Sequence, residues 1–417
     1  MKRTGHGSGK GLTEYRKPMN PGEIWRGLIE RLAWGGKGLA RSEDGRLLLL
    51  SAPLALFPGE EVEAEVHWKA RHGEGKVIGW ITKDRQRVPA GCPVAATCGG
   101  CDLWEAGEAA ADLKKTMAAD LLHRQLPDIK DWQFLPAPAD ARRHRIQLHW
   151  DGVALGYHRR GSHQIVPVKS CPVATDSISK AIPRLLEALQ EKILPQRPQR
   201  WELATGTPEG RIVAIDEKGH AWLLEPDGWH RNDSEMHEAF ADFTLRHHAG
   251  GFFQVSPPWA LAAFRSVLDG WNLKGRTLFD LYGGVGFFSA LLGNRFQRRV
   301  LVEYDTAAVE WAKKNLDQLG LPSECIASDT GKWLSENLGD SDDLILLDPP
   351  RSGLEPEVSA KLLTAKAETM VLVGCDGAAF CRDIQRLSPT WKLTDLVVLD
   401  LFPLTHHVEC VGLLKRL

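Results

Sequence analysis

The stretch DLYGGVGFFSALL, residues 280–292, decides the fold of the C-terminal part of this sequence. It reads as an apolar strand that runs into a glycine turn and then into a helix. Three more apolar runs follow, with helical stretches between them: RRVLVEY (298–304), DDLILLDPP (342–350) and TMVLVGC (369–375). Strands and helices that alternate in this way predict an α/β fold with a doubly wound, Rossmann-like sheet. Ligands of such sheets bind at the carboxyl ends of the strands.

The glycine turn indicates a nucleoside-containing cofactor. Gly284 and Gly286 let the backbone approach a ligand closely, and Glu303 ends the next strand, where it can bind a ribose diol. A dinucleotide fold shares these features. However, Ser289 stands where the third glycine of the dinucleotide fingerprint would be, and Asp280 would repel a pyrophosphate. A cofactor without phosphates fits better, which favours S-adenosylmethionine over a nicotinamide.

Two more acidic residues follow buried strands. Asp329 in CIASD could accept a hydrogen bond from an adenine amino group, or it could be an ordinary turn residue. Asp348 is followed by two prolines, which fix the backbone into a rigid wall for the cofactor's reactive end. Enzymes that methylate exocyclic amines usually carry an aromatic residue after the two prolines. Arg351 occupies that position, which counts against amine methylation.

Length and composition limit the class of protein. A chain of 417 residues is too long for one compact core, so two or three domains are expected. The longest apolar run, at 47–57, is too short to span a bilayer, and the N-terminus lacks the apolar region of a signal peptide. The sequence therefore predicts a cytoplasmic protein with no membrane segment and with reduced thiols. Nothing indicates an obligate protein partner, and we expect a monomer.

Three regions are expected before and around the sheet. Residues 1–17 form a basic tail with five Lys or Arg and one Glu, and residues 18–84 read as short strands with Gly and Pro turns. The second stretch predicts a small β-barrel and resembles a TRAM domain, an oligonucleotide-binding-like (OB-like) RNA-binding module. Residues 85–250 are expected to form a central α+β domain, and residues 251–417 to form the doubly wound domain.

The central domain is expected to present a cationic hairpin. We predict helices over 102–125 and 176–193, and a hairpin in RIQLHW-DG-VALGYHRR (145–160) with a tight Asp-Gly turn. Residues 141–170 hold six Lys or Arg against one Asp, together with four histidines. Such an excess is often only a solvated face, but in a chain of net charge -2 it is also what a phosphate-binding surface would look like.

Four cysteines have the spacing of a metal site. Cys92, Cys98 and Cys101 are spaced C-x5-C-x2-C, and Cys171 could complete the set. Four thiolates suit either tetrahedral zinc or an iron-sulfur cluster, and spacing alone does not separate the two. Disulfides are not expected in a reducing compartment.

Six short motifs, taken in order, carry a family resemblance: FFQVS at 252, DLYGGVG at 280, VE at 302, DPPRSG at 348, GCD at 374 and HHVE at 406. They resemble the RNA (uracil-5-)-methyltransferases, S-adenosylmethionine-dependent enzymes that make 5-methyluridine. The resemblance covers nearly the whole chain. It implies a Rossmann-like methyltransferase domain and a [4Fe-4S] cluster on the four cysteines, with zinc as the alternative occupant.

The resemblance also assigns the catalytic residues. Carbon 5 of uracil is a weak nucleophile, so a thiolate must first add to carbon 6, and a base must later remove the proton from carbon 5. Cys375 matches the family's nucleophile and Glu409 its base. Without the resemblance, they would read as a packed thiol and a strand-edge acid. The cofactor contacts that it implies, with the first and last also near the uracil, are Gln254, Tyr282, Glu303, Asp329 and Asp348.

Some positions depart from the family pattern. The family commonly has Ser-Cys-Asn-Pro around its nucleophile, whereas Gly374, Asp376 and Gly377 surround the cysteine here. A carboxylate next to a thiol disfavours the thiolate, so a cationic neighbour or the bound RNA would have to activate it. Phe287 stands where a polar residue often contacts the cofactor, and Ser256 stands where Asn is common.

The expected substrate is a uridine flipped out of a folded RNA. Large-subunit ribosomal RNA is favoured over transfer RNA, because cluster-bearing relatives mostly modify the former. Two alternatives remain: methylation of an amine or of cytosine carbon 5, and an RNA-binding family member without catalysis.

Overall fold

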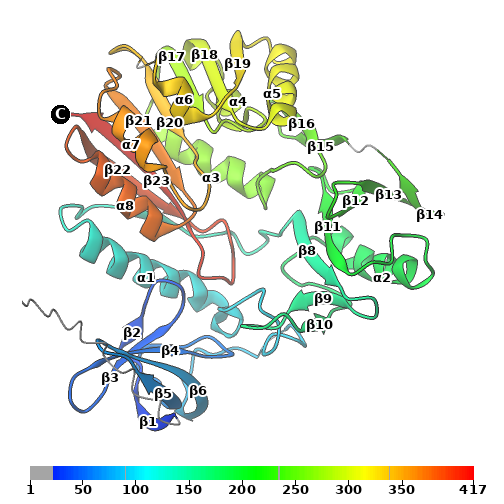
Figure 1. Cartoon of the computed structure of the whole chain (residues 1–417), viewed down its shortest axis with the longest axis vertical. Coiled ribbons are helices and arrows are strands. Elements are labelled where there is room, and N and C mark those ends of the chain that lie inside the picture. Colours follow the sequence, from blue (N-terminus) through cyan, green and yellow to red (C-terminus); the bar gives the residue numbers. More distant parts are fainter. Residues whose placement is uncertain (1–21, 90, 233–234, 338) are drawn as a thin grey trace, which may run out of the picture.

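The computed structural model describes residues 22–89, 91–232, 235–337 and 339–417. The basic tail expected at 1–17 lies outside the described residues, as do residues 18–21. A β-rich N-terminal region, a mixed middle region and an α/β C-terminal region follow one another along the chain (Figure 1). None of the described helices is long and apolar enough to cross a membrane.

The N-terminal region is all β, as the sequence predicted. It forms one sheet with the strand order β1-β5-β6-β4-β3-β2. Along β5, Val62, Ala64 and Val66 are buried and alternate with glutamates, which is the pattern of a sheet with one face on a core. The strands are β1 (Glu23–Leu28), β2 (Arg31–Leu32), β3 (Gly38–Arg41), β4 (Leu47–Ser51), β5 (Glu61–Trp68) and β6 (Gly73–Thr82).

The middle region contains both predicted helices and an antiparallel sheet. The 3-10 helix η1 (Trp104–Ala109) leads into α1 (Ala110–Gln125), and α2 (Asp176–Gln190) packs on the sheet. The sheet order is β10-β9-β8-β11-β12-β13-β14, and β15 pairs with β16. The strands are β8 (Arg145–Trp150), β9 (Leu155–His158), β10 (Ile165–Pro167), β11 (Gln199–Thr205), β12 (Ile212–Asp216), β13 (Ala221–Glu225), β14 (Gly228–Arg231), β15 (Glu235–Ala239) and β16 (Thr244–His248).

The predicted hairpin is present, but its turn is longer than expected. Trp150 pairs with Leu155, so residues 151–154 form the loop instead of the Asp-Gly pair alone. The Asp151 carboxylate accepts hydrogen bonds from the N–H groups of Val153 (2.9 Å) and Ala154 (2.7 Å). These bonds replace strand pairing and thereby lengthen the turn.

The C-terminal region is the predicted α/β sheet, with the order β19-β18-β17-β20-β21-β23-β22-β7. The five strands β19, β18, β17, β20 and β21 are parallel to one another. Strand β23 runs antiparallel to both of its neighbours, β21 and β22, and β7 forms the edge of the sheet, parallel to β22. The strands are β7 (Gln133–Leu135), β17 (Gly275–Leu281), β18 (Phe296–Glu303), β19 (Ser323–Ala327), β20 (Leu344–Leu347), β21 (Thr369–Gly374), β22 (Trp391–Leu399) and β23 (Glu409–Arg416).

Helices cover both faces of this sheet, so its central strands are apolar throughout. All four residues of β20 are buried. One face packs against α3, α4 and α5, and the other packs against α1, α7 and α8 (Figure 1). The helices are α3 (Pro257–Gly270), α4 (Phe287–Leu292), η2 (Gly293–Arg295), α5 (Thr306–Gln318), α6 (Thr330–Leu334), α7 (Pro356–Leu362) and α8 (Gly377–Leu387).

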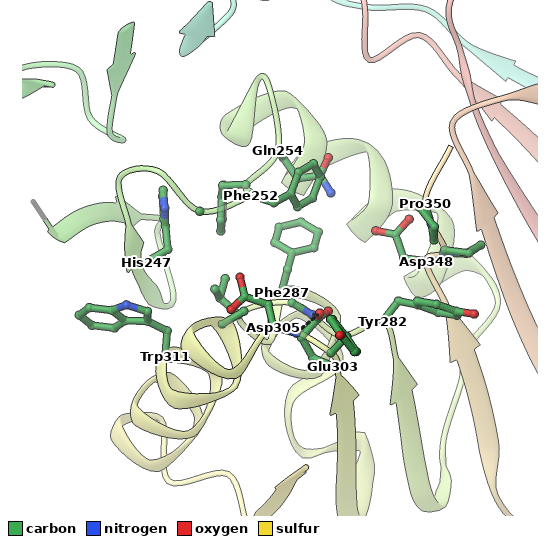
Figure 2. Close-up of a pocket in the computed structure, with 18 of the residues that line it drawn as sticks. His247, Phe252, Gln254, Tyr282, Phe287, Glu303, Asp305, Trp311, Asp348 and Pro350 are labelled. Atoms are coloured by element: carbon green, nitrogen blue, oxygen red, sulfur yellow. Dashed lines mark hydrogen bonds between the residues drawn. The ribbon is translucent and has the colours of Figure 1, made fainter. Parts of the chain in front are cut away.

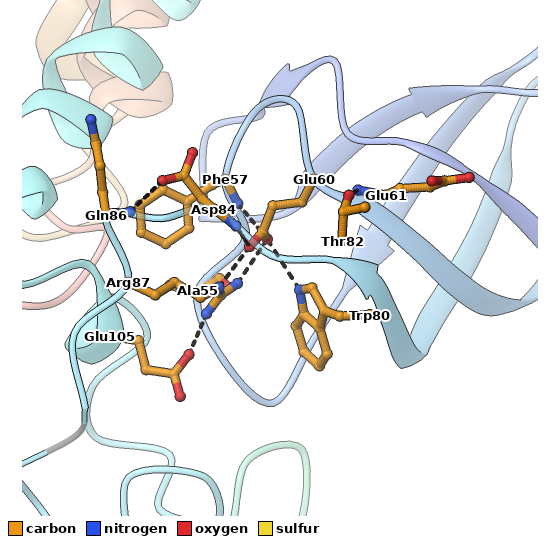
Figure 3. A network of polar contacts seen from close by, with 10 residues as sticks. All are labelled: Ala55, Phe57, Glu60, Glu61, Trp80, Thr82, Asp84, Gln86, Arg87 and Glu105. Atoms are coloured by element: carbon orange, nitrogen blue, oxygen red, sulfur yellow. Dashed lines mark hydrogen bonds and ion pairs between the residues drawn. The ribbon is translucent and has the colours of Figure 1, made fainter.

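A buried ion pair joins the N-terminal sheet to the chain that leaves it (Figure 3). Glu60 accepts hydrogen bonds from Arg87 Nε at 2.6 Å and from Trp80 Nε1 at 3.1 Å. The N–H groups of Phe57 and Asp84 also donate to it, each at 3.0 Å. Burial alone would raise the pKa of Glu60, but these donors outweigh it and hold that pKa below its ordinary value.

Replacing Glu60 by Gln should destabilise the N-terminal region by about 2 kcal/mol, because Arg87 would keep Glu105 but lose the more deeply buried of its two carboxylate partners. Since the folded-state pKa of Glu60 is lowered, its contribution is present above the unfolded pKa and is lost as the pH falls through the folded value. Denaturant unfolding of wild type and Glu60→Gln should therefore converge in acid. Glu61→Gln is the matched control, and equal destabilisation by both variants would contradict the interpretation.

Candidate active site

One cavity of about 820 Å³ lies at the carboxyl ends of the parallel strands and collects most of the predicted site residues. Figure 2 shows Gln254 and Phe252 facing Glu303 and Asp305 across this cavity. The predicted residues that line it are Gln254, Tyr282, Gly284, Glu303, Asp329, Asp348, Cys375 and Glu409. Gly286 is not among the lining residues.

The glycine turn after β17 shapes one side of the cavity. Tyr282, Gly284 and Gly286 have φ angles of 60°, 52° and 90°, a region that glycine adopts without strain and tyrosine does not. The Gly284 N–H donates to Glu303 Oε2 at 3.1 Å, and the Asp305 N–H donates to Oε1 at 2.9 Å. Two backbone donors thus fix the Glu303 carboxylate at the cavity wall.

The remaining polar residues near the turn have separate roles. The Tyr282 hydroxyl donates to Glu355 Oε2 at 2.5 Å, and burial raises the pKa of Tyr282, so the phenol stays protonated. Asp329 caps helix α6, where its Oδ1 accepts the Lys332 N–H at 2.8 Å. Asp280 lies behind the turn, is fully buried and accepts hydrogen bonds from the Ser289 N–H (3.0 Å) and Oγ (2.6 Å). Burial raises the pKa of Asp280 to about 7.

The loop that carries Gln254 is held from the middle region. Arg145, on β8, donates to the carbonyl oxygens of Gly251 and, at 2.7 Å, of Ala249, and it pairs with Glu202 at 2.9 Å. The Arg145 side chain is only 14% exposed. Arg145 therefore does not contribute its charge to the surface of the hairpin that was expected to be cationic, and it instead orients the cavity loop.

Cys375 and Glu409 meet because of the antiparallel strand β23. Gly374, the last residue of β21, pairs with Cys410 in β23, so the start of β23 lies at the carboxyl end of β21. Cys375 follows β21 and is half-buried, whereas Glu409 begins β23 and is buried. Two residues from distant motifs thereby line the same cavity.

The carboxyl groups that disfavour the Cys375 thiolate are those of Glu409 and Asp348, and not that of Asp376, which the sequence suggested. Burial, then Glu409 and Asp348, raise the pKa of Cys375 to about 12, while Arg351 opposes this shift. Asp376 instead caps helix α8, where its Oδ1 accepts the Ala379 N–H at 2.8 Å. The expected effect of Asp376 on the thiol is thus corrected: its carboxylate serves the helix.

Glu409 and Asp348 are two acidic residues that line the same cavity. Burial, followed by repulsion from Asp348, raises the pKa of Glu409 well above its ordinary value. Burial also raises the pKa of Asp348 to about 7. The Asp348 side chain is half-buried, and it lines the cavity. Glu409 Oε1 is buried and has no hydrogen-bond partner among the described residues. Since two carboxylates in one poorly solvated site cannot both ionise easily, the pair can hold a proton near neutral pH.

Arg351 is the functional residue that the sequence analysis undervalued. It was read only as an argument against amine methylation, yet it lines the cavity and is the cation that favours the Cys375 thiolate. Its Nη2 lies 2.8 Å from Nδ1 of His407. The signal that could have found it is its position directly after the two prolines that follow a cavity carboxylate.

The charges of the cavity suit a cationic cofactor better than a phosphorylated one. Glu303, Asp305 and Asp329 line it around the glycine turn, and Arg351 is the only Lys or Arg among the described lining residues. A pyrophosphate would be repelled by these acids, whereas a sulfonium cation would be attracted. The residues present therefore fit S-adenosylmethionine.

The four predicted metal ligands line a second, smaller pocket. Cys98 and Cys171 are buried, and Cys92 and Cys101 are half-buried around it. Burial and, more weakly, the neighbouring thiols raise the pKa of Cys101 to about 12, while Arg143, which also lines the pocket, opposes this shift. A bound metal ion would favour the thiolates further. As placed, however, no group of three or more His, Cys, Asp or Glu side chains in the described part of the chain could hold a metal ion.

Known proteins resemble this chain along nearly its whole length. The family model "tRNA (Uracil-5-)-methyltransferase" matches residues 340–417. A 23S rRNA (uracil(1939)-C(5))-methyltransferase of Pseudomonas fluorescens is 30% identical over 94% of this chain and 92% of its own. This chain belongs to the RNA (uracil-5-)-methyltransferase family.

Two further similarities agree with the family assignment. An uncharacterized RNA methyltransferase of Streptomyces coelicolor is 32% identical over 94% of this chain and 93% of its own. The crystal structure of a Pyrococcus abyssi tRNA (uracil-54, C5)-methyltransferase in complex with S-adenosyl-L-homocysteine matches with a TM-score of 0.73 at 23% identity, over 94% of this chain and all of its own. The second similarity confirms the α/β fold.

Substitutions around the thiol should separate the charges that act on it. Arg351→Met should lower the rate of Cys375 alkylation by iodoacetamide about three- to tenfold, because the opposing cation is lost from a partly solvated position. Asp376→Asn keeps the helix cap and should leave the rate unchanged. Mass spectrometry of the Cys375 peptide over time measures both rates, and a large rise in Asp376→Asn would contradict the assignment.

Proposed function

We propose that this protein methylates carbon 5 of a uridine in structured RNA through a transient covalent bond between Cys375 and carbon 6. The observation that carries the proposal is the meeting of Cys375 and Glu409 in the cavity that also holds the glycine turn. A half-buried thiol beside a buried carboxyl group suits addition to a pyrimidine ring followed by proton removal.

Each residue has a defined task in this reaction. The Cys375 sulfur bonds to carbon 6, and the electrons of the 5,6 double bond move towards the carbon 4 oxygen, which makes carbon 5 nucleophilic. S-adenosylmethionine supplies the methyl group that carbon 5 takes up. Glu409 then accepts the proton from carbon 5, the 5,6 double bond re-forms, and the sulfur leaves as a thiolate.

The acidic pair and Arg351 handle the protons and charge. The Cys375 thiol must lose its proton before it attacks; because the thiol is only half-buried, this proton can leave to water, so that the Asp348–Glu409 pair keeps a position for the proton of carbon 5. Arg351 stabilises the resulting thiolate. We assign the cofactor to the side of the cavity formed by Tyr282, Gly284, Glu303 and Asp329, and place the uracil between Gln254, Asp348 and Cys375. Gly286 acts indirectly, by allowing the turn to enter α4.

RNA would be bound by the regions before the catalytic domain. We propose the division 18–84, 85–250 and 251–417, with the first part a TRAM (OB-like) module and the basic tail at 1–17 an additional RNA contact. We favour large-subunit ribosomal RNA as substrate, with transfer RNA as the alternative. One relative is named for a ribosomal and one similar structure for a transfer RNA uridine.

We propose a [4Fe-4S] cluster on Cys92, Cys98, Cys101 and Cys171. Support comes from the four thiols that surround one pocket and from their family-like spacing. The cluster would pin the segment before α1 to the hairpin region. Metal analysis of anaerobically purified protein should find iron and sulfide, and Cys101→Ser should lose both; zinc without sulfide would replace this proposal with a zinc site.

A covalent adduct is the direct test of the proposed reaction. RNA that carries 5-fluorouridine at the target should form a persistent protein–RNA adduct, because a base cannot abstract fluorine as it does a proton. Cys375→Ala should form none, whereas Cys325→Ala, whose thiol lies outside the cavity, should behave like wild type. Denaturing gel electrophoresis measures the adduct. An adduct that persists in Cys375→Ala would exclude this nucleophile, and its absence in wild type on total RNA would favour a non-catalytic RNA-binding role.

The target RNA can be identified without assuming it. Nucleosides from purified 23S, 16S and transfer RNA should be compared by mass spectrometry, with and without the gene. We expect 5-methyluridine to fall by one residue per molecule in 23S rRNA and to return when the gene is restored, but not with Cys375→Ala. A loss confined to transfer RNA would reverse the preferred substrate, and a loss of 5-methylcytidine or of an N-methylated base would exclude uracil methylation.

A further inference from the structure

The loop between β22 and β23, residues 400–408, leads directly into Glu409 and is fastened by a segment distant in sequence. Phe402 in this loop lines the active-site cavity. The segment that begins just after Cys101 and continues into α1 forms hydrogen bonds with this loop. We call residues 400–408 the catalytic loop.

Lys114, on α1, places a charge inside the protein against this loop. Its side chain is completely buried. The ammonium Nζ lies 2.5 Å from Asp400 Oδ1, 2.7 Å from the Phe402 carbonyl oxygen and 2.9 Å from the His407 carbonyl oxygen. A lysine ammonium has three N–H donors, so the catalytic loop accepts all of them.

A buried ammonium is costly, and its geometry indicates why it is tolerated. Burial lowers the pKa of Lys114, and the adjacent Asp400 carboxylate counteracts this. An apolar side chain could fill the same volume in α1 without a desolvation penalty. Only a group with several donors can join carbonyl oxygens five residues apart, at Phe402 and His407, and so specify one conformation of the catalytic loop.

Asp102 fastens the middle of the same loop. Its Oδ1 accepts the His406 N–H at 3.0 Å, and its Oδ2 bonds to the His406 ring. The N–H groups of Asp102 and Leu103 donate to the Leu404 carbonyl oxygen at 3.1 and 3.0 Å. Leu404 has a φ angle of 61°, which a leucine rarely adopts, so these bonds hold the loop in a conformation that it would not favour alone.

The conformation of the catalytic loop can affect the Cys375 thiol through His407 and Arg351. The His407 carbonyl is held by Lys114, and its ring contacts Arg351 Nη2 at 2.8 Å. Arg351 in turn lines the cavity as the cation that favours the Cys375 thiolate. A continuous series of contacts therefore runs from α1 to the active site.

We infer that Lys114 is a positioning residue for methyl transfer: its three hydrogen bonds hold the catalytic loop so that His407 keeps Arg351 in the cavity that Cys375 also lines. The inference rests on the proposed function only for the role of Cys375 as nucleophile. Lys114 itself touches neither RNA nor cofactor, since it is buried outside the cavity.

The test must separate positioning from loss of stability. Lys114→Met leaves Asp400 charged and buried, so this variant should unfold more easily. The double variant Lys114→Met/Asp400→Asn removes both charges, and Asn can still accept the Phe402 N–H, which lies 3.2 Å from Asp400 Oδ1. Its melting temperature should return towards that of wild type. The hydrogen bonds from Lys114 to the carbonyl oxygens of Phe402 and His407 stay lost, and the Phe402 carbonyl oxygen keeps the donors of Thr405, within the loop itself. Lys115→Met, at the exposed neighbouring position, is the control.

The readout is alkylation of Cys375 by iodoacetamide at fixed pH, followed by mass spectrometry in parallel with binding of S-adenosylhomocysteine. We expect the double variant to be alkylated more slowly than wild type, by at most the roughly three- to tenfold of Arg351→Met, with unchanged S-adenosylhomocysteine binding and with Lys115→Met unaffected. Adding Arg351→Met to the double variant should slow alkylation no further than Arg351→Met does alone, because both changes act on the same contact.

Alkylation at the wild-type rate in the double variant would overturn the inference, and so would a parallel loss of S-adenosylhomocysteine binding, which would indicate general damage. Both results are independent of RNA. Failure of the proposed reaction would appear instead as wild-type protein that forms no adduct with fluorinated RNA, whatever its alkylation rate.

Discussion

The burial of two carboxyl groups, those of Glu409 and Asp348, in one poorly solvated cavity is the constraint on which the site depends. Burial raises the pKa of both groups, and repulsion from Asp348 raises that of Glu409 further. Burial, followed by these two carboxyl groups, raises the pKa of the Cys375 thiol. A thiol held neutral in this way is protected from unwanted reactions until a proton leaves and a cation is nearby. The pair and Arg351 thus act in opposite directions on one sulfur atom, so small movements of Arg351 can change its reactivity.

The geometry that permits this interaction is set by one antiparallel strand. In a purely parallel sheet, every strand would begin at the edge opposite the ligands. Because β23 runs in the reverse direction between β21 and β22, its first residue lies beside the last residue of β21. Glu409 therefore reaches the ligand edge from the start of a strand, whereas Cys375 reaches it from the end of one.

Sequence patterns predicted the fold well, and the site in part. Apolar runs and the glycine turn gave the strands and the cofactor edge, since period and turn chemistry are local properties. The pairing of Cys375 with Glu409 needed a family resemblance, because strand direction is not local. Arg145 and Lys114 were missed because a basic residue in a polar stretch looks solvated, although both are buried against carbonyl oxygens of remote loops. Asp376 was misread because its helix-capping role depends on where α8 begins.

The short strand β7 has a consequence for how this chain can be divided. Residues 133–135 lie in the first third of the sequence, far from the other strands of the catalytic sheet, yet they complete its edge beside β22. A fragment that begins at residue 251 would expose the edge of the sheet to pairing with other molecules. It would also leave Asp400 buried without the Lys114 ammonium group that pairs with it. Exchange of RNA-recognition modules between relatives should therefore join the chains ahead of residue 102, so that the transplanted catalytic part brings α1 and β7 with it.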